Sequence, residues 1–156
     1  MLGTRRAELG DTALIGHACH QLLTQLVQHE GPVLDGVLAR RIARAHGFQR
    51  TGSRIQERVE QIARRLFDAT KEAGGTFYWP RGVDTHAEFA FRKPSDEGSA
   101  RDIEEICQPE LVSLARWVLG NGKSGEEALT AMAREIGLMK LRNASRGRLE
   151  AALRVL

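Results

Sequence analysis

Four side chains that can bind an anion recur at helical spacing in this 156-residue chain, and we call them the arginine row: Arg54, Arg58, Gln61 and Arg65. Their separations of four, three and four residues place them on one face of an α-helix. Guanidinium groups hold several N–H donors in a fixed plane that matches phosphate and carboxylate oxygens. The pattern therefore predicts a surface that binds an anionic partner.

The segment that carries the arginine row also contains an apolar stripe, one residue after each of its members: Ile55, Val59, Ile62 and Leu66. One residue is roughly 100° of rotation about a helix axis, so the two stripes lie on different faces. Ser53 and Gln56 match the S/T-x-x-E/Q capping box. We therefore predict a helix that begins at Arg54, buries its aliphatic side chains and exposes its guanidinium groups.

Two further helices are expected before this one. Helical periodicity runs from about residue 13 to residue 29, and Gly31-Pro32 ends that helix. Asp35 can cap the next helix. Its inward-facing residues are predicted to be Leu38, Ile42 and Ala45. Gly47 stands where a left-handed C-terminal cap is expected, with Phe48 as its apolar partner. Three helices with a short glycine-containing connection before the third are typical of a helix-turn-helix.

The N-terminal end of the third helix is where a helix-turn-helix contacts nucleic acid. Side chains and unpaired backbone N–H groups at this end point at phosphates and base edges. The polar residues expected there are Gln49, Arg50, Thr51, Ser53 and Arg54. Phosphate contacts fix the position of a protein on DNA without reading its sequence, so no sequence preference follows.

Two segments rich in β-forming residues follow the third helix: residues 76–80 (TFYWP) and 88–92 (EFAFR). They are expected to form the wing of a winged helix. Three cations in or near this wing are candidates for a neighbouring phosphate: Arg81, Arg92 and Lys93. The aromatic residues Phe77, Tyr78 and Trp79 have two interpretations. We favour a core position beneath the wing over an exposed platform of Trp79 or Tyr78 for base stacking.

The C-terminal part repeats the plan without a wing. Pro109 opens a helix, GNGKS (120–124) makes a turn, and Ser124 with Glu127 matches a second capping box. A shift of 90 positions aligns residues 42–59 with residues 132–149 without a gap and with four identical residues. The matching order of helices indicates a duplicated unit. The cations of this second copy that are candidates for nucleic-acid contact are Lys140, Arg142 and Arg146.

The predicted fold is therefore mainly α with a small β wing. It consists of two tandem winged-helix or helix-turn-helix units, of which the second lacks its wing. The expected divisions are a flexible N-terminus over residues 1–13, a winged-helix unit over 14–92, a linker over 93–108 and a three-helix unit over 109–156. The sequence leaves the oligomeric state open.

Composition favours a folded protein of the cytoplasm. The chain is 42% hydrophobic, and its net charge of +3 is unevenly distributed. Between Arg40 and Arg65, eight arginines stand against only two acids. Two such basic clusters, the other from Arg134 to Arg154, suggest surfaces for a polyanion. The two cysteines are distant and single, which fits a reducing compartment. No apolar run is long enough to span a bilayer, and no membrane partner is expected.

Patterns typical of enzymes are incomplete. GNGKS lacks the first glycine of a phosphate loop, because Trp117 stands in its place. His17 and His20 share a helix face, but a zinc site needs three or four ligands. The acids of residues 102–105 have no companion lysine pattern and are interpreted as a solvated turn. There is no GxSxG motif. We therefore expect no catalysis by this chain alone, no metal and no cofactor.

Residues 30–55 (EGPVLDGVLARRIARAHGFQRTGSRI), followed by FYWP and by RDIEEICQPEL at 101–111, carry a family resemblance. The chain resembles an uncharacterised domain near the C-terminus of large bacterial proteins that join a superfamily 1 helicase core to an endonuclease-like module. The resemblance covers about residues 17–156 and implies an accessory module of a DNA-processing enzyme, without supplying an activity. The second half departs from it, since LMKLRNASRGRL (138–149) stands where the family tends to repeat a G-F-x-R-x-G-x-R-I-like stretch.

Three functions are compatible with these features. We favour a non-catalytic module that binds double-stranded or junction DNA and positions a helicase–nuclease partner or parent chain. The alternative is a protein-interaction module whose basic helix pairs with carboxylates of the helicase or nuclease part. A more remote alternative is a free-standing transcription regulator, which would need a dimer to read two half-sites.

Overall fold

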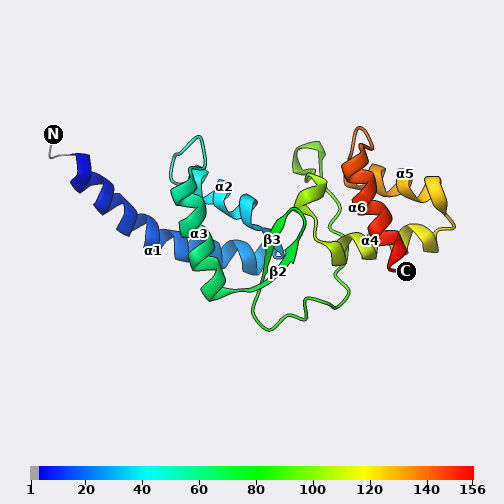
Figure 1. The fold of residues 1–156 in the computed structure, drawn as a ribbon, viewed down its shortest axis with the longest axis horizontal. Helices are drawn as coiled ribbons and strands as arrows, with labels where there is room; N and C mark the ends of the chain where they lie inside the picture. Colours follow the sequence, from blue (N-terminus) through cyan, green and yellow to red (C-terminus); the bar gives the residue numbers. More distant parts are fainter. Residues whose placement is uncertain (1–3) are drawn as a thin grey trace. The chain divides into compact units, whose positions relative to one another are not determined.

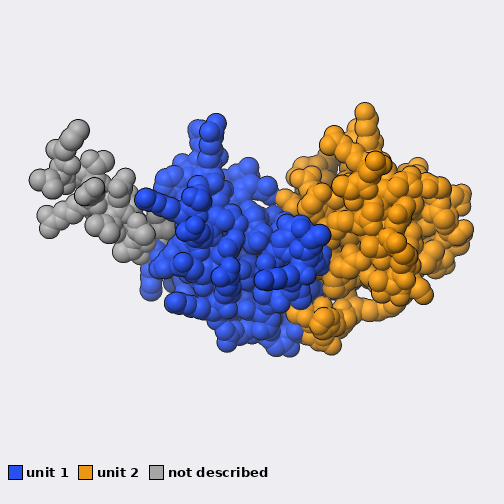
Figure 2. Space-filling view, in the orientation of Figure 1, with its two compact units in different colours: residues 1–83 blue, residues 84–156 orange. Residues whose placement is uncertain are grey.

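The computed structural model describes the backbone of residues 4–156 and the side chains of residues 16–156. It divides into two compact units, unit 1 (residues 1–83) and unit 2 (residues 84–156), which Figure 2 colours separately. The described part of the chain contains six α-helices and one three-stranded antiparallel sheet. The predicted fold class, mainly α with a small β element, is confirmed.

Unit 1 contains three helices and the sheet (Figure 1). Its helices are α1 (Thr4–Glu30), α2 (Asp35–Ala45) and α3 (Ser53–Leu66). Its strands are β1 (Val33–Leu34), β2 (Asp68–Glu72) and β3 (Gly75–Trp79). Helix α1 begins at Thr4, so residues 4–13 are helical where a flexible N-terminus was predicted. Residues 1–3 of that predicted segment lie outside the described residues.

The sheet has the order β1-β3-β2, and both pairs of neighbours are antiparallel. Strands β2 and β3 form a hairpin in which Asp68 lies opposite Trp79 and Glu72 lies opposite Gly75. The predicted wing strand over residues 88–92 is wrong, because β3 pairs with residues 68–72 instead. That segment, DATKE, is poor in β-forming residues, so its pattern gave no sign of a strand. Residues 88–92 belong to unit 2, where Phe91 packs against the core.

The core of unit 1 combines one face of each helix with the sheet. Among its fully buried members are Leu23 of α1, Leu38 and Ile42 of α2, and Val59 of α3. Ala45, predicted to face inward, is exposed. The buried face of α2 runs instead through the alanines at positions 39 and 43, whose small side chains let the helices approach closely.

The three consecutive aromatic residues of β3 are all buried. Phe77, Tyr78 and Trp79 are 0%, 1% and 1% exposed. The indole N–H of Trp79 donates to the hydroxyl of Thr70 across the hairpin at 2.9 Å, so its polar group is satisfied. The predicted core position of these residues is confirmed, and an exposed stacking platform at Tyr78 or Trp79 is ruled out.

Unit 2 contains three helices and, within its described residues 84–156, no strand. The helices are α4 (Gln108–Gly120), α5 (Gly125–Ile136) and α6 (Asn143–Arg154). The segment predicted as a linker, residues 93–108, is part of this unit. Ile103, Ile106 and Cys107 are buried, and the two isoleucines join the core of α4, α5 and α6. These isoleucines anchor the segment to the core. Their role was not predicted because they stand in a stretch whose composition is mostly charged and polar.

The same connection precedes the last helix of each unit. Gly47 and Gly137 have φ angles of 81° and 90°, a left-handed conformation that favours glycine. The N–H of Phe48 donates to the carbonyl of Ala43, and that of Leu138 to the carbonyl of Ala133, each at 2.9 Å. Helices α2 and α5 begin 90 residues apart, as do α3 and α6. The Phe48 side chain, predicted to pack as the partner of this cap, is 45% exposed.

The predicted capping boxes do not form. Ser53 is the first residue of α3 and Gly52 its N-cap, and no side chain caps the helix. The amide of Gln56 instead donates to Glu60 at 3.0 Å. Ser124 is the N-cap of α5, also without a side-chain hydrogen bond. Asp35, predicted to cap α2, is its first residue, and its carboxylate accepts from the N–H groups of Gly36 and Thr76.

Candidate nucleic-acid interface

Helix α3 presents its two faces as the sequence predicts. Val59 and Ala63 are buried against α1 and α2, and the neighbouring aliphatic side chains pack around them. The adjoining face, about 100° away around the helix axis, exposes all four members of the arginine row to solvent. Hydrophobic burial thus fixes the rotation of α3 about its axis, and this rotation determines that the guanidinium groups point outward.

The arginine row is not neutralised by acids within the described residues. Glu60 accepts from Gln56 and pairs with Arg64 at 3.5 Å, and Arg64 lies on a different side of α3. Within residues 16–156, no carboxylate forms an ion pair with Arg50, Arg54, Arg58 or Arg65. The terminal nitrogen of Arg58 lies near α1, since a Cβ added at Gly16 would be 3.4 Å from it. Within residues 16–156, the arginines of the row therefore have no carboxylate as a counterion.

The turn before α3 adds polar groups at the N-terminal end of the row. The side chains predicted at this end are all exposed: Gln49, Arg50, Thr51, Ser53 and Arg54. Because no side chain caps α3, its first backbone N–H groups have no side-chain acceptor. N–H groups and cations at one helix end favour an oxygen-rich anion such as phosphate.

Two further exposed cations of unit 1 lie on or beside the hairpin. Arg81 is exposed, and its guanidinium donates to the carbonyl of Arg65 at the C-terminal end of α3. Lys71 is exposed near the tip of the β2–β3 hairpin and was missed by sequence reasoning. Lys71 lies in β2, which was not predicted as a strand because the hairpin was expected over residues 76–92.

Arg92 and Lys93 are not part of this surface, contrary to their predicted place in the wing. Both belong to unit 2. Arg92 pairs at 3.1 Å with Glu110, a fully buried carboxylate that also pairs with Arg101 at 2.6 Å. Lys93 pairs with Glu135 at 3.0 Å. Their charges are thus used to hold residues 92–101 on the helices of unit 2.

The three cations predicted as candidates in the second copy have different surroundings in the structure. Arg146 pairs with Glu126 at 2.5 Å, and its hydrogen bond lowers the pKa of that carboxyl. Lys140 and Arg142 are exposed in the connection before α6 and form no ion pair within residues 16–156. Arg148, the counterpart of Arg58, donates to the carbonyls of Ile103 and Ile106 at 2.6 and 2.9 Å. Unit 2 therefore has no counterpart of the arginine row.

The two units also differ in charge. Residues 1–83 contain 12 lysines and arginines against 8 acids, whereas residues 84–156 contain 11 against 12. Unit 1 is thus the basic half of the chain, although the sequence total is only +3. Attraction of a polyanion is expected from unit 1.

The buried cluster of Glu110, Arg92 and Arg101 predicts how the unfolding free energy of unit 2 depends on pH. Burial raises the pKa of Glu110, but the hydrogen bonds and positive charges of Arg101 and Arg92 outweigh it and hold the pKa below its ordinary value of 4.5. A carboxyl with a lowered folded-state pKa stabilises the fold above its unfolded pKa, and this contribution is lost as pH falls through the folded value. The difference in unfolding free energy between the wild type and Glu110→Gln is therefore expected to shrink below about pH 4.5. Urea denaturation across pH measures it, and a difference that stays constant on acidification contradicts the assignment.

The remaining motifs singled out in the sequence lie at separate places in the structure. His17 and His20 are exposed on α1, and no group of three metal-ligating side chains occurs among the described residues. GNGKS forms the turn between α4 and α5, as predicted. Cys19 and Cys107 are both buried, and they do not form a disulfide with each other. The described helices include none with the length and hydropathy of a bilayer span.

A comparison with protein families gives one match. The model of a family described as "Protein of unknown function (DUF3320)" matches residues 20–57, from within α1 to the first part of α3. The matched stretch includes α2, the Gly47 turn and the N-terminal end of the arginine row. The family is uncharacterised, so the match identifies no catalytic activity. No curated protein and no solved structure matches the chain.

Proposed function

We propose that unit 1 binds the phosphate backbone of double-stranded or junction DNA through the exposed face of α3. The observation that carries this proposal is the arginine row, three guanidinium groups on one solvent-facing helix side without a carboxylate partner among residues 16–156. The uncapped start of α3 with the exposed Arg50 extends it at one end, and Arg81, which donates to the carbonyl of Arg65, extends it at the other. Such a surface matches a regular array of phosphates better than a single small anion.

The role that fits this surface is a non-catalytic one. The resemblance to the C-terminal domain of helicase-like proteins supports an accessory module that holds DNA for a helicase or nuclease partner. Both copies share the helix order, but only unit 1 displays a free cationic helix, so we assign nucleic-acid contact to unit 1. Lys140 and Arg142 are the only predicted residues of unit 2 that we retain as candidates for such contact.

Fluorescence anisotropy with labelled DNA tests the proposal directly. The full chain is titrated at low salt into a short duplex, a four-way junction and a single strand of the same sequence. Saturable binding to the duplex or the junction is the expected result. Absence of binding to all three at low salt contradicts the proposal. It would favour the protein-interaction alternative, in which the carboxylates of a partner protein pair with the arginine row. A marked preference for palindromic duplexes favours the transcription-regulator alternative.

A further inference from the structure

One aromatic ring of unit 1 lies in solvent, in the turn that leads into the proposed DNA-binding helix. Phe48 stands between α2 and α3 and is 45% exposed. The other phenylalanine, tyrosine and tryptophan side chains of unit 1 are buried: Phe67, Phe77, Tyr78 and Trp79. The fold of unit 1 therefore covers every other ring of this kind and leaves this one at the surface.

The exposure of Phe48 does not follow from the conformation of its turn. The equivalent turn of unit 2 carries Leu138, whose N–H makes the equivalent hydrogen bond to the preceding helix. Leu138 packs against the core of unit 2, an apolar contact that often accompanies a glycine cap. In unit 1 the side chain at the same place is larger and remains in solvent. The ring of Phe48 thus serves the core of unit 1 less than Leu138 serves that of unit 2.

The backbone holds this exposed ring in a defined place. The N–H groups of Gly47 and Phe48 donate to the carbonyls of Arg44 and Ala43 at the end of α2, at 3.0 and 2.9 Å. Gly47 adopts the left-handed conformation that this turn requires. A ring on an ordered turn loses less conformational entropy on binding than a ring on a disordered one. Since these contacts involve the backbone, the side chain of residue 48 can be exchanged without removing them.

The residues that follow Phe48 are suited to a nucleic acid. Gln49, Arg50 and Thr51 are exposed, and no carboxylate forms an ion pair with Arg50 within residues 16–156. Residues two positions apart span at most about 7 Å of backbone, so a phosphate at Arg50 and a base at Phe48 can belong to neighbouring nucleotides. Aromatic rings beside cations are the elements with which proteins bind unpaired nucleotides.

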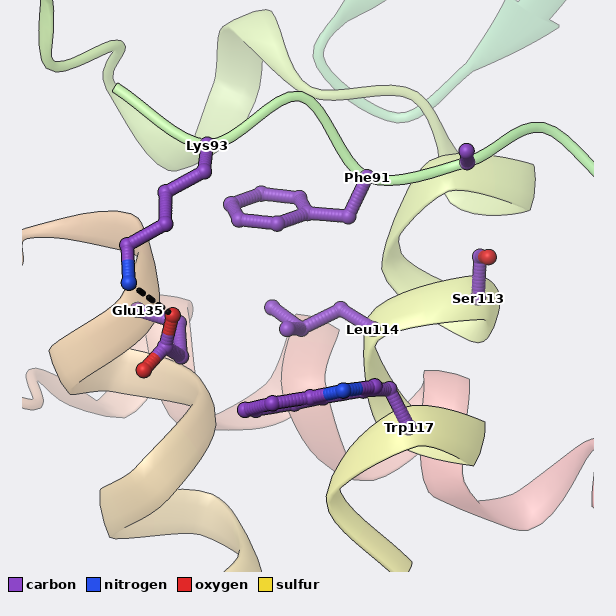
Figure 3. Close-up of a pocket in the computed structure, with 7 residues that line it drawn as sticks. Phe91, Lys93, Ser113, Leu114, Trp117 and Glu135 are labelled. Atoms are coloured by element: carbon purple, nitrogen blue, oxygen red, sulfur yellow. Dashed lines mark ion pairs between the residues drawn. The ribbon is translucent and has the colours of Figure 1, made fainter. Parts of the chain in front are cut away.

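A second exposed aromatic residue, Trp117 of α4, has different surroundings. It is 56% exposed, and Figure 3 shows its ring at one side of a hollow that Phe91 and the ion pair of Lys93 and Glu135 also line. The lysine of this hollow is already neutralised, and the carboxylate would repel a phosphate. Of these two rings, Phe48 is therefore the one whose neighbours attract DNA.

We propose that Phe48 stacks on an unpaired base, so that unit 1 prefers DNA in which a duplex adjoins unpaired nucleotides, as at a fork or a single-strand extension. In a continuous duplex the faces of the bases are covered by their neighbours, and separating them costs free energy, whereas an unpaired base offers its face directly. The inference rests on the proposed DNA binding and deepens it. The arginine row holds the phosphates of the duplex, and Phe48 recognises the place where the strands separate.

Three labelled DNAs with the same duplex sequence provide the probe. The first is the blunt duplex, the second has a single-strand extension of thymidines, and the third has an equally long extension of abasic nucleotides. The two extensions carry the same phosphates and differ in their bases. In anisotropy titrations with the full chain, the thymidine extension is expected to bind at least about fivefold more tightly than the abasic one.

Variants of residue 48 identify the ring as the cause of this preference. In Phe48→Ala and Phe48→Leu the affinity ratio of the two extensions is expected to fall to about one, while the affinity for the blunt duplex changes less than about twofold. Phe48→Leu keeps an apolar side chain without a planar face, and Phe48→Trp is expected to retain the preference. Val83→Ala is the control, since it removes the other large apolar side chain that is exposed among residues 16–83.

Equal binding of the thymidine and abasic extensions by the wild type overturns the inference, while binding of the blunt duplex still supports the proposed function. A preference that persists in both Phe48→Ala and Phe48→Leu also overturns it, because another residue then contacts the base. Absence of binding to all three DNAs overturns the inference together with the proposed function. The Arg54→Glu plus Arg58→Glu variant separates the two contributions, since it is expected to bind all three DNAs more weakly and to keep the affinity ratio.

Discussion

Replacement of both Arg54 and Arg58 by glutamate is expected to lower the affinity for a short DNA duplex at least about 100-fold at low salt. Each substitution removes a guanidinium that faces solvent on α3 and introduces a carboxylate that repels phosphate. A loss of about 1.4 kcal/mol for each site is a tenfold change in the dissociation constant, and the two sites act together. Anisotropy titrations with the same duplex measure the change.

The control for this variant has the same change of net charge at another place. Arg134 and Arg154 are exposed arginines of unit 2, and their joint replacement by glutamate is expected to alter duplex affinity less than about threefold. An equal loss in both variants would show that only total charge matters and would contradict a specific role of α3. Replacement of Lys140 and Arg142 by glutamate then reports whether the second copy contributes.

Removal of Arg101 is expected to destabilise unit 2 by about 3 kcal/mol. Its guanidinium donates to both carboxylate oxygens of Glu110, at 2.6 and 3.0 Å, and to the carbonyl of Arg92 at 2.9 Å. In Arg101→Ala the fully buried carboxylate of Glu110 keeps only Arg92 as a partner, and a buried charge without sufficient compensation is costly. Urea denaturation followed by far-UV circular dichroism gives the change in unfolding free energy.

Arg116→Ala is the matched control for Arg101→Ala. Arg116 also pairs with a glutamate of unit 2, Glu88, but both side chains of that pair are more than half exposed. Exposed ion pairs contribute less than about 1 kcal/mol, so this substitution is expected to be nearly neutral. Similar effects of the two alanine variants would contradict the distinction between the buried cluster and the surface pair.

Local sequence patterns predicted the six helices, although α1 begins at Thr4 and not near residue 13. The spacing of Val59 with its aliphatic neighbours fixes the buried face of α3, and Gly47 and Gly137 mark turns whose backbone requires a left-handed residue. The hairpin was misplaced because strand pairing is a long-range property. Residues 68–72 have no strong β preference of their own and become a strand through their pairing with β3.

The candidate site could be predicted only in part for a related reason. Helical periodicity determines which side chains of α3 face solvent, so the exposure of the arginine row follows from sequence. Whether a cation is free depends on tertiary contacts. Arg92, Lys93 and Arg146 meet carboxylates that are 18, 42 and 20 residues away in the chain, which no local pattern indicates. Lys71 was missed because β2, the strand that carries it, was not predicted.

The central claim is that the guanidinium groups of α3 displace counterions from DNA, and its most direct test is the salt dependence of duplex binding. About five phosphate contacts predict a slope of log K against log salt near −4 to −5 for the wild type. The Arg54→Glu plus Arg58→Glu variant is expected to have a slope that is shallower by about 2. An identical slope in wild type and variant, or wild-type affinity that does not change with salt, would contradict the claim.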